Sequence, residues 1–132
     1  TRRSSDLITH GALIMTSYKL VMPEHTNQFG FLFGGYLLQW IDETAWMGAS
    51  MDFPGRRFVT IGMNHVEFRK SAHGGAMLRI EITQLHRGTT SVTYHARVFS
   101  REMGTEEDIE IFVTEITFVN VNREGHKCPI TP

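Results

Sequence analysis

Only one segment of this chain has the spacing of an amphipathic helix, and the segments after it have the pattern of β-strands. Residues 34–51 place apolar and small side chains on one face at intervals of three and four. Pro54-Gly55 ends the segment. Because one helix can cover only one face of a sheet, we expect an α+β fold in which the sheet curves around a single central helix.

Five segments have strand character. Alternation of apolar with charged or hydroxyl side chains is clearest in residues 77–85 and 91–101. The full set of predicted strands is 13–21, 58–68, 77–85, 91–101 and 109–121. Such a sheet leaves an exposed edge strand and one uncovered face, so we expect dimerisation through sheet edges. We expect residues 1–12 to be a flexible N-terminus and residues 13–130 to form one domain.

Composition excludes several classes of function. The chain has 132 residues, of which 41% are hydrophobic and 20% charged, as expected for one globular domain. A net charge of −1 gives no electrostatic case for binding nucleic acid. The single cysteine, Cys128, excludes an intramolecular disulfide and fits a cytoplasmic protein. No apolar run approaches the roughly 20 residues of a membrane span, so we expect no membrane partner.

Asp42 is the strongest candidate for a catalytic residue. It follows Leu38 by four residues and precedes Ala45 by three, which places it inside the apolar stripe of the helix. A buried carboxylate is costly unless it is paired or used, so we interpret Asp42 as a base that activates water. The alternatives are a partly exposed carboxylate at the edge of the stripe or a buried pair with an arginine.

Gly34-Gly35 opens the helix and leaves backbone N–H groups without helical acceptors at its positive end. Such donors can hold an oxyanion, although a double glycine can also serve turn geometry or close packing alone. Asn27, in the preceding loop, can hold water or a carbonyl, or can form a local turn. With Asp42, these residues predict attack of water on an ester-like carbonyl.

Other chemistry has little support in the sequence. None of the seven histidines has a metal-ligand spacing, so no metal site is expected. There is no serine nucleophile elbow and no glycine-rich phosphate motif. Basic and small residues at predicted strand ends can hold phosphates or can be solvated; these are Phe68-Arg69-Lys70 and Arg87-Gly88-Thr89-Thr90-Ser91.

The motif around the helix start resembles the hot-dog fold acyl-CoA thioesterases, in the branch of short bacterial acyl-CoA thioester hydrolases. The residues that match this family in order and spacing are Met22-Pro23, Asn27, Gly30, Phe33-Gly34-Gly35 and Asp42. Val59-Thr60 is similar to the central strand that follows, and Arg87–Ser91 to the start of a later strand. The resemblance covers about residues 14–130.

The resemblance implies hydrolysis of an acyl-CoA to a free acid and CoA, without a cofactor. Asp42 would be the general base or the nucleophile, N–H groups near Gly34 and Gly35 would polarise the carbonyl, and Thr60 would position water. Asn27 of one protomer would face Asp42 of its partner in a homodimer, and three dimers would form a hexamer. The residues expected near the phosphates or pantetheine of CoA are Arg69, Arg87, Gly88 and Ser91.

Two other functions remain open at this stage. A hot-dog hydratase or dehydratase would need a histidine paired with a carboxylate, and the motif region shows no such pair. A non-catalytic acyl-CoA sensor would keep the pocket and could dispense with Asp42. The acyl chain length depends on which large residues close the tunnel beside the helix; the candidates are Trp40, Trp46, Met47, Met51 and Phe53.

Overall fold

The computed structural model describes residues 13–131, so the predicted flexible segment 1–12 lies outside the described part of the chain. Its elements are β1 (Leu13–Leu20), a short 3-10 helix η1 (Pro23–His25), α2 (Gly34–Asp52), β2 (Phe58–Phe68), β3 (Met77–Arg87), β4 (Ser91–Arg101) and β5 (Ile109–Asn120). The predicted boundaries agree to within two residues. Within residues 13–131, no helix is long and apolar enough to span a bilayer.

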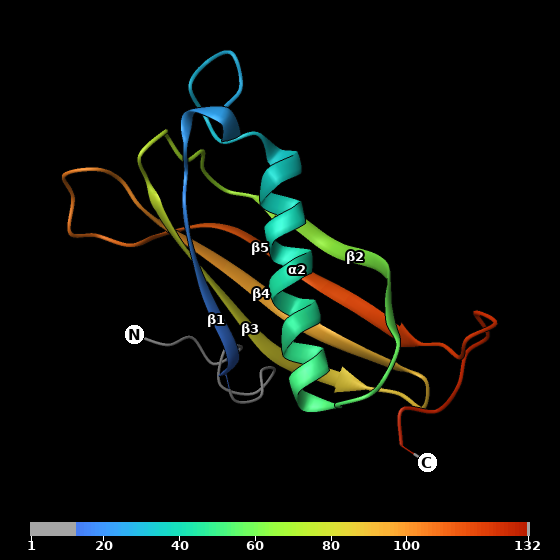
Figure 1. Ribbon diagram of the computed structural model, residues 1–132. Helices are drawn as coiled ribbons and strands as arrows, with labels where there is room; N and C mark the ends of the chain where they lie inside the picture. The colour runs from blue at the N-terminus through green and yellow to red at the C-terminus, as the bar shows by residue number, and fades with distance from the viewer. Residues whose placement is uncertain (1–12, 132) are drawn as a thin grey trace.

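The five strands form one antiparallel sheet in the order β1-β3-β4-β5-β2. Helix α2 lies across one face of this sheet, with β1 and β2 at the two edges (Figure 1). The prediction of one central helix wrapped by a five-stranded antiparallel sheet is therefore confirmed. Both connections of α2 lead to edge strands, which leaves the three inner strands to form the floor beneath the helix.

The hydrophobic core lies between α2 and the inner strands. Alternate residues of β3, β4 and β5 face the helix and are fully buried, among them Leu78, Ile80, Ile82, Val92, Ala96, Val98, Phe112, Ile116 and Phe118. Burial of one such side chain contributes about 1.5–3 kcal/mol to folding. Gly48 lets α2 approach β1 closely, because a Cβ there would lie 3.1 Å from Ile14. This packing fixes the distance of α2 from the sheet and its rotation about its own axis.

Strand β2 is an open and unusually exposed edge. It pairs only with β5, and ten of its eleven residues are not buried. Its exposed apolar side chains are Val59, Ile61, Val66 and Phe68. An exposed, apolar edge strand is a template for pairing with another chain. This edge is the surface that a second protomer would be expected to cover.

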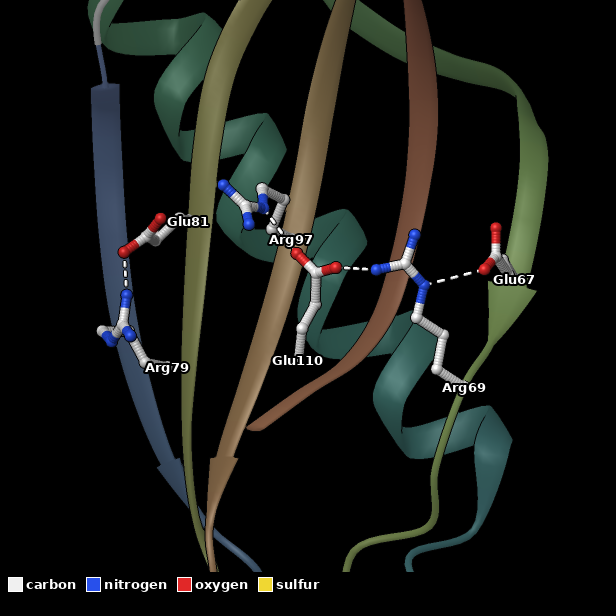
Figure 2. Close-up of polar contacts among 6 residues, drawn as sticks. All are labelled: Glu67, Arg69, Arg79, Glu81, Arg97 and Glu110. Atoms are coloured by element: carbon white, nitrogen blue, oxygen red, sulfur yellow. Dashed lines mark hydrogen bonds and ion pairs between the residues drawn. The ribbon is translucent and has the colours of Figure 1, made fainter. Parts of the chain in front are cut away.

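The face of the sheet opposite α2 carries charges that pair with one another (Figure 2). Arg69 Nε donates to Glu67 at 2.7 Å, and its Nη1 contacts Glu110. Arg97 Nε donates to the other oxygen of Glu110 at 2.6 Å. A second set joins Arg79 to Glu81 and, at 3.1 Å, to Asp108. The face that the helix leaves uncovered is therefore polar and largely self-neutralised.

The loop between β2 and β3 and the turn between β4 and β5 are tied together by Glu102. Its Oε1 lies 2.7 Å from His73 Nδ1, and Ser100 Oγ donates to its Oε2 at 2.6 Å. Partial burial raises the pKa of Glu102, but the hydrogen bonds from Ser100 and His73 outweigh this effect and hold the pKa below its usual value.

Glu102→Gln should lower the free energy of unfolding at neutral pH by about 1 kcal/mol. Because the pKa is lowered in the folded state, the stabilisation is complete above the ordinary glutamate pKa and disappears as the pH falls through the folded-state value. Urea unfolding of both proteins between neutral and acidic pH measures this difference. Glu107→Gln, an exposed residue of the same turn, is the control; a pH-independent difference for Glu102→Gln would contradict the assignment.

Candidate active site

Asn27 lies in the loop between β1 and α2 and organises that loop with its side chain. Its Oδ1 accepts hydrogen bonds from the backbone N–H groups of Phe29 at 2.9 Å and Phe31 at 3.2 Å. The local turn that the sequence left as an alternative is therefore formed. The same bonds orient the amide so that its NH₂ group is the end able to donate to a ligand.

The start of α2 offers free backbone donors. Phe33 is the N-cap and provides no side-chain cap, while the N–H groups of Tyr36 and Leu37 both donate to its carbonyl. Within residues 13–131, the N–H groups of Gly34 and Gly35 have no acceptor. A Cβ at position 35 would lie 2.7 Å from the exposed Phe33 ring, so any other residue there would require that ring to move. This end of the helix is suited to holding an oxyanion or carbonyl oxygen.

Asp42 lies at the edge of the buried face of α2 and not inside it. The buried face is centred on Trp40, Ile41 and Thr44, so the predicted stripe was rotated by part of a turn and Leu38 is only half-buried. Asp42 instead turns toward β2, where Thr60 Oγ1 donates to its Oδ1 at 2.6 Å. No cation among the described residues pairs with it. The carboxylate is thus half-exposed and oriented by one hydroxyl, with Oδ2 free to act on water.

Two cavities flank this region. One, of about 370 Å³, is lined by Asp42, Glu43, Trp46 and Met47. The other, of about 270 Å³, lies at the helix start and is lined by Leu32, Gly34, Leu37, Phe68, Arg69, Lys70, Ser71, Ala72 and Ile111. Since Arg69 is held by Glu67 and Glu110, Lys70 is the cation of this second cavity with no ion pair among the described residues. The sequence shows Lys70 only within a basic run and gives no signal for Ser71.

The other predicted CoA-binding residues lie at the opposite end of the helix. The Arg87 guanidinium stacks 4.9 Å from the ring of Phe53, the C-cap of α2. The N–H of Gly88 donates to the carbonyl of Ser91 at 2.8 Å. The 19 residues of α2 separate this group from Arg69 and Gly34 by about 28 Å. One protomer therefore does not bring the four predicted residues together.

One protomer also does not bring Gly34 and Asp42 to the same carbonyl. Their separation of eight positions along α2 corresponds to about 12 Å of helix. A donor, a carbonyl, a water and a carboxylate in reactive contact span roughly 9 Å at most, at about 3 Å for each step. Within one protomer, the helix start and the Asp42 carboxylate therefore lie too far apart to act on one carbonyl.

The single helix and the antiparallel sheet that it crosses define a hot-dog protein. Among the described residues, no group of three or more histidine, cysteine, aspartate or glutamate side chains could hold a metal ion. Residues 29–107 match the family model of the thioesterase superfamily. The chain belongs to the thioesterase superfamily, as the resemblance of its motifs predicts.

Similar proteins extend this result. A relative from Zymomonas mobilis described as an uncharacterised acyl-CoA thioester hydrolase is 26% identical, over 86% of this chain and 75% of its own. A solved apo-hexameric acyl-CoA thioesterase is 34% identical, with a TM-score of 0.79 over 86% of this chain and 72% of that one. An acyl-CoA hydrolase from Staphylococcus aureus, solved with butyryl coenzyme A and coenzyme A, is 26% identical, with a TM-score of 0.77 over 86% and 69%.

Replacing Gly34 by proline should remove one donor of the site without removing the helix. Proline suits the first position of a helix, and Phe33 already has the extended backbone (φ −70°, ψ 129°) that a residue before proline needs. We expect thioester turnover to fall about a hundredfold to a thousandfold with an unchanged circular dichroism spectrum. Gly34→Ala keeps the N–H and is the matched control; equal activity of the two variants would exclude this donor.

Proposed function

We propose that this protein hydrolyses acyl-CoA thioesters to a carboxylic acid and CoA. The observation that carries the proposal is the contact between Thr60 and Asp42, which orients a half-exposed carboxylate beside an apolar cavity. The hydrolase from Staphylococcus aureus has also been solved with one aspartate, and separately one threonine, replaced by alanine. Those are the two residue types that meet in this site.

In the proposed reaction, Asp42 Oδ2 removes a proton from a water molecule as the water oxygen attacks the thioester carbonyl carbon. The carbonyl π-bond opens, and the resulting oxyanion is held by the N–H groups at the start of α2 and by the Asn27 amide. When the carbonyl re-forms, the C–S bond breaks and the CoA sulfur takes the proton from Asp42. Thr60 donates to Oδ1 and leaves Oδ2 to contact the water. No step requires a cofactor.

We place the donors and the base on different protomers of a homodimer. The 12 Å of helix between Gly34 and Asp42 supports this arrangement, as does the exposed apolar edge of β2 on which Thr60 lies. Pairing of two β2 strands would cover that edge. The hexameric state of the related thioesterase supports further association of such dimers.

The phosphates of CoA would lie near the helix start, where Lys70 and the positive end of α2 attract anions. Arg69 contributes less than the sequence predicts, since Glu67 and Glu110 already neutralise it. Arg87, Gly88 and Ser91 of a neighbouring protomer would join the site only through assembly.

Asp42→Asn should lower kcat for acyl-CoA hydrolysis about a hundredfold or more, the scale of a lost general base. Direct loss of thioester absorbance measures the rate without a thiol reagent, which Cys128 would complicate. Glu43→Gln, one residue along and solvent-exposed, should retain most of the activity. Binding of acyl-CoA without turnover by the wild-type protein would instead identify a sensor.

Mixing two inactive variants tests the shared site. Asn27→Ala and Asp42→Asn should each be weakly active, but random pairing of protomers yields mixed dimers in which one of the two sites is intact. Co-refolding equal amounts should restore about a quarter of the wild-type activity. A site formed within one protomer predicts no recovery, and mixing without exchange of protomers is the negative control.

A further inference from the structure

We infer that Trp46 limits the length of the acyl group, by closing the cavity beside Asp42 one helical turn beyond the carboxylate. This inference rests on the proposed function, because it assigns a specificity to the same site. It divides acyl thioesters into short chains that fit between Asp42 and the indole and long chains that do not.

Asp42 and Trp46 are held against β2 by two parallel contacts. They are four residues apart, so both lie on the same side of α2, about 6 Å apart along the helix axis. Thr60 Oγ1 donates to Asp42 at 2.6 Å, and the indole Nε1 of Trp46 donates to the carbonyl of Phe58 at 3.1 Å. Both side chains therefore lie on the side of α2 that faces β2, with the indole one turn beyond the carboxylate.

The cavity between these residues is suited to an acyl chain. Its volume is about 370 Å³, and it is lined by Trp46 and Met47 together with Asp42 and Glu43. A water activated by Asp42 must contact the carbonyl carbon, so the acyl substituent extends into this apolar space. The CoA side of the thioester then points to the helix start of the other protomer, where the basic cavity lies. The polar and apolar surroundings of the site thus fix the direction of the substrate.

Trp46 forms a fixed wall, whereas Met47 can move aside. The indole is 44% exposed and yet held by a hydrogen bond to the backbone, which restricts its rotation. Methionine is unbranched and adapts to its neighbours. Of the other candidates for closing the tunnel, Trp40 is buried in the core and Phe53 packs on Phe58. Neither lines the cavity.

The test is the dependence of kcat/KM on chain length for straight-chain acyl-CoAs from acetyl to palmitoyl. The wild-type protein should lose activity beyond short chains, and Trp46→Ala should raise the ratio of long-chain to short-chain kcat/KM by about tenfold or more. Trp46→Phe keeps most of the bulk but loses the bond to Phe58, and should lie between the two. Tyr18→Ala removes an exposed aromatic ring from β1, at the opposite edge of the sheet, and should keep the wild-type profile.

An equal loss of activity at all chain lengths in Trp46→Ala, an unchanged profile, or a wild-type preference for long chains would overturn the inference. If Trp46→Ala does not fold or assemble, Trp46→Leu takes its place with the same expected direction. Calorimetric measurement of the affinity for non-hydrolysable alkyl-CoA thioethers distinguishes failure of this inference from failure of the proposed hydrolase function. Chain-length-dependent binding that Trp46→Ala relaxes supports the inference even without turnover, whereas no binding of any analogue overturns it together with the proposed function.

Discussion

The structure depends on a single helix, α2, that packs on the core with one side and contacts the edge strand β2 with another. One side of α2 must seal the core over β3, β4 and β5, because no other element within residues 13–131 covers that face of the sheet. The neighbouring side turns toward β2, and it carries Asp42 and Trp46. The residues that seal the core fix the rotation of the helix, and this rotation places the carboxylate at the edge of the apolar stripe. Packing and chemistry are therefore set by the same constraint.

Much of the fold follows from local patterns in the sequence. The period of α2 and the alternation in β3 and β4 reflect which faces must be buried, so these elements could be located without tertiary information. The rotation of α2 could not be derived in this way. Small residues such as Ala45 and Gly48 define a stripe only broadly, and the large buried side chain of Trp40 decides its centre. Asp42 was consequently predicted to be more buried than it is.

Features of the candidate site that lie within one short segment could be predicted from the sequence. Contacts between residues far apart in the sequence could not. Asn27 and Gly34 belong to one short loop and helix start, and the structure shows a local turn at Asn27 and the first residue of α2 at Gly34. One partner of Arg69, Glu67, is two residues away in the sequence, whereas Glu110 comes close only because β2 pairs with β5. A sequence shows that an arginine is present, but not that a neighbouring strand already neutralises it.

The paired charges on the outer face of the sheet also bear on how a substrate arrives. Arginines and carboxylates there cancel over a few ångströms (Figure 2), and the whole chain has a net charge of −1. Such a surface has little field beyond the Debye length of about 8 Å at physiological ionic strength. A highly anionic ligand would meet this protein by nearly unguided diffusion. Its rate of encounter would then vary little with salt, and its orientation would be selected only at close range by the helix start.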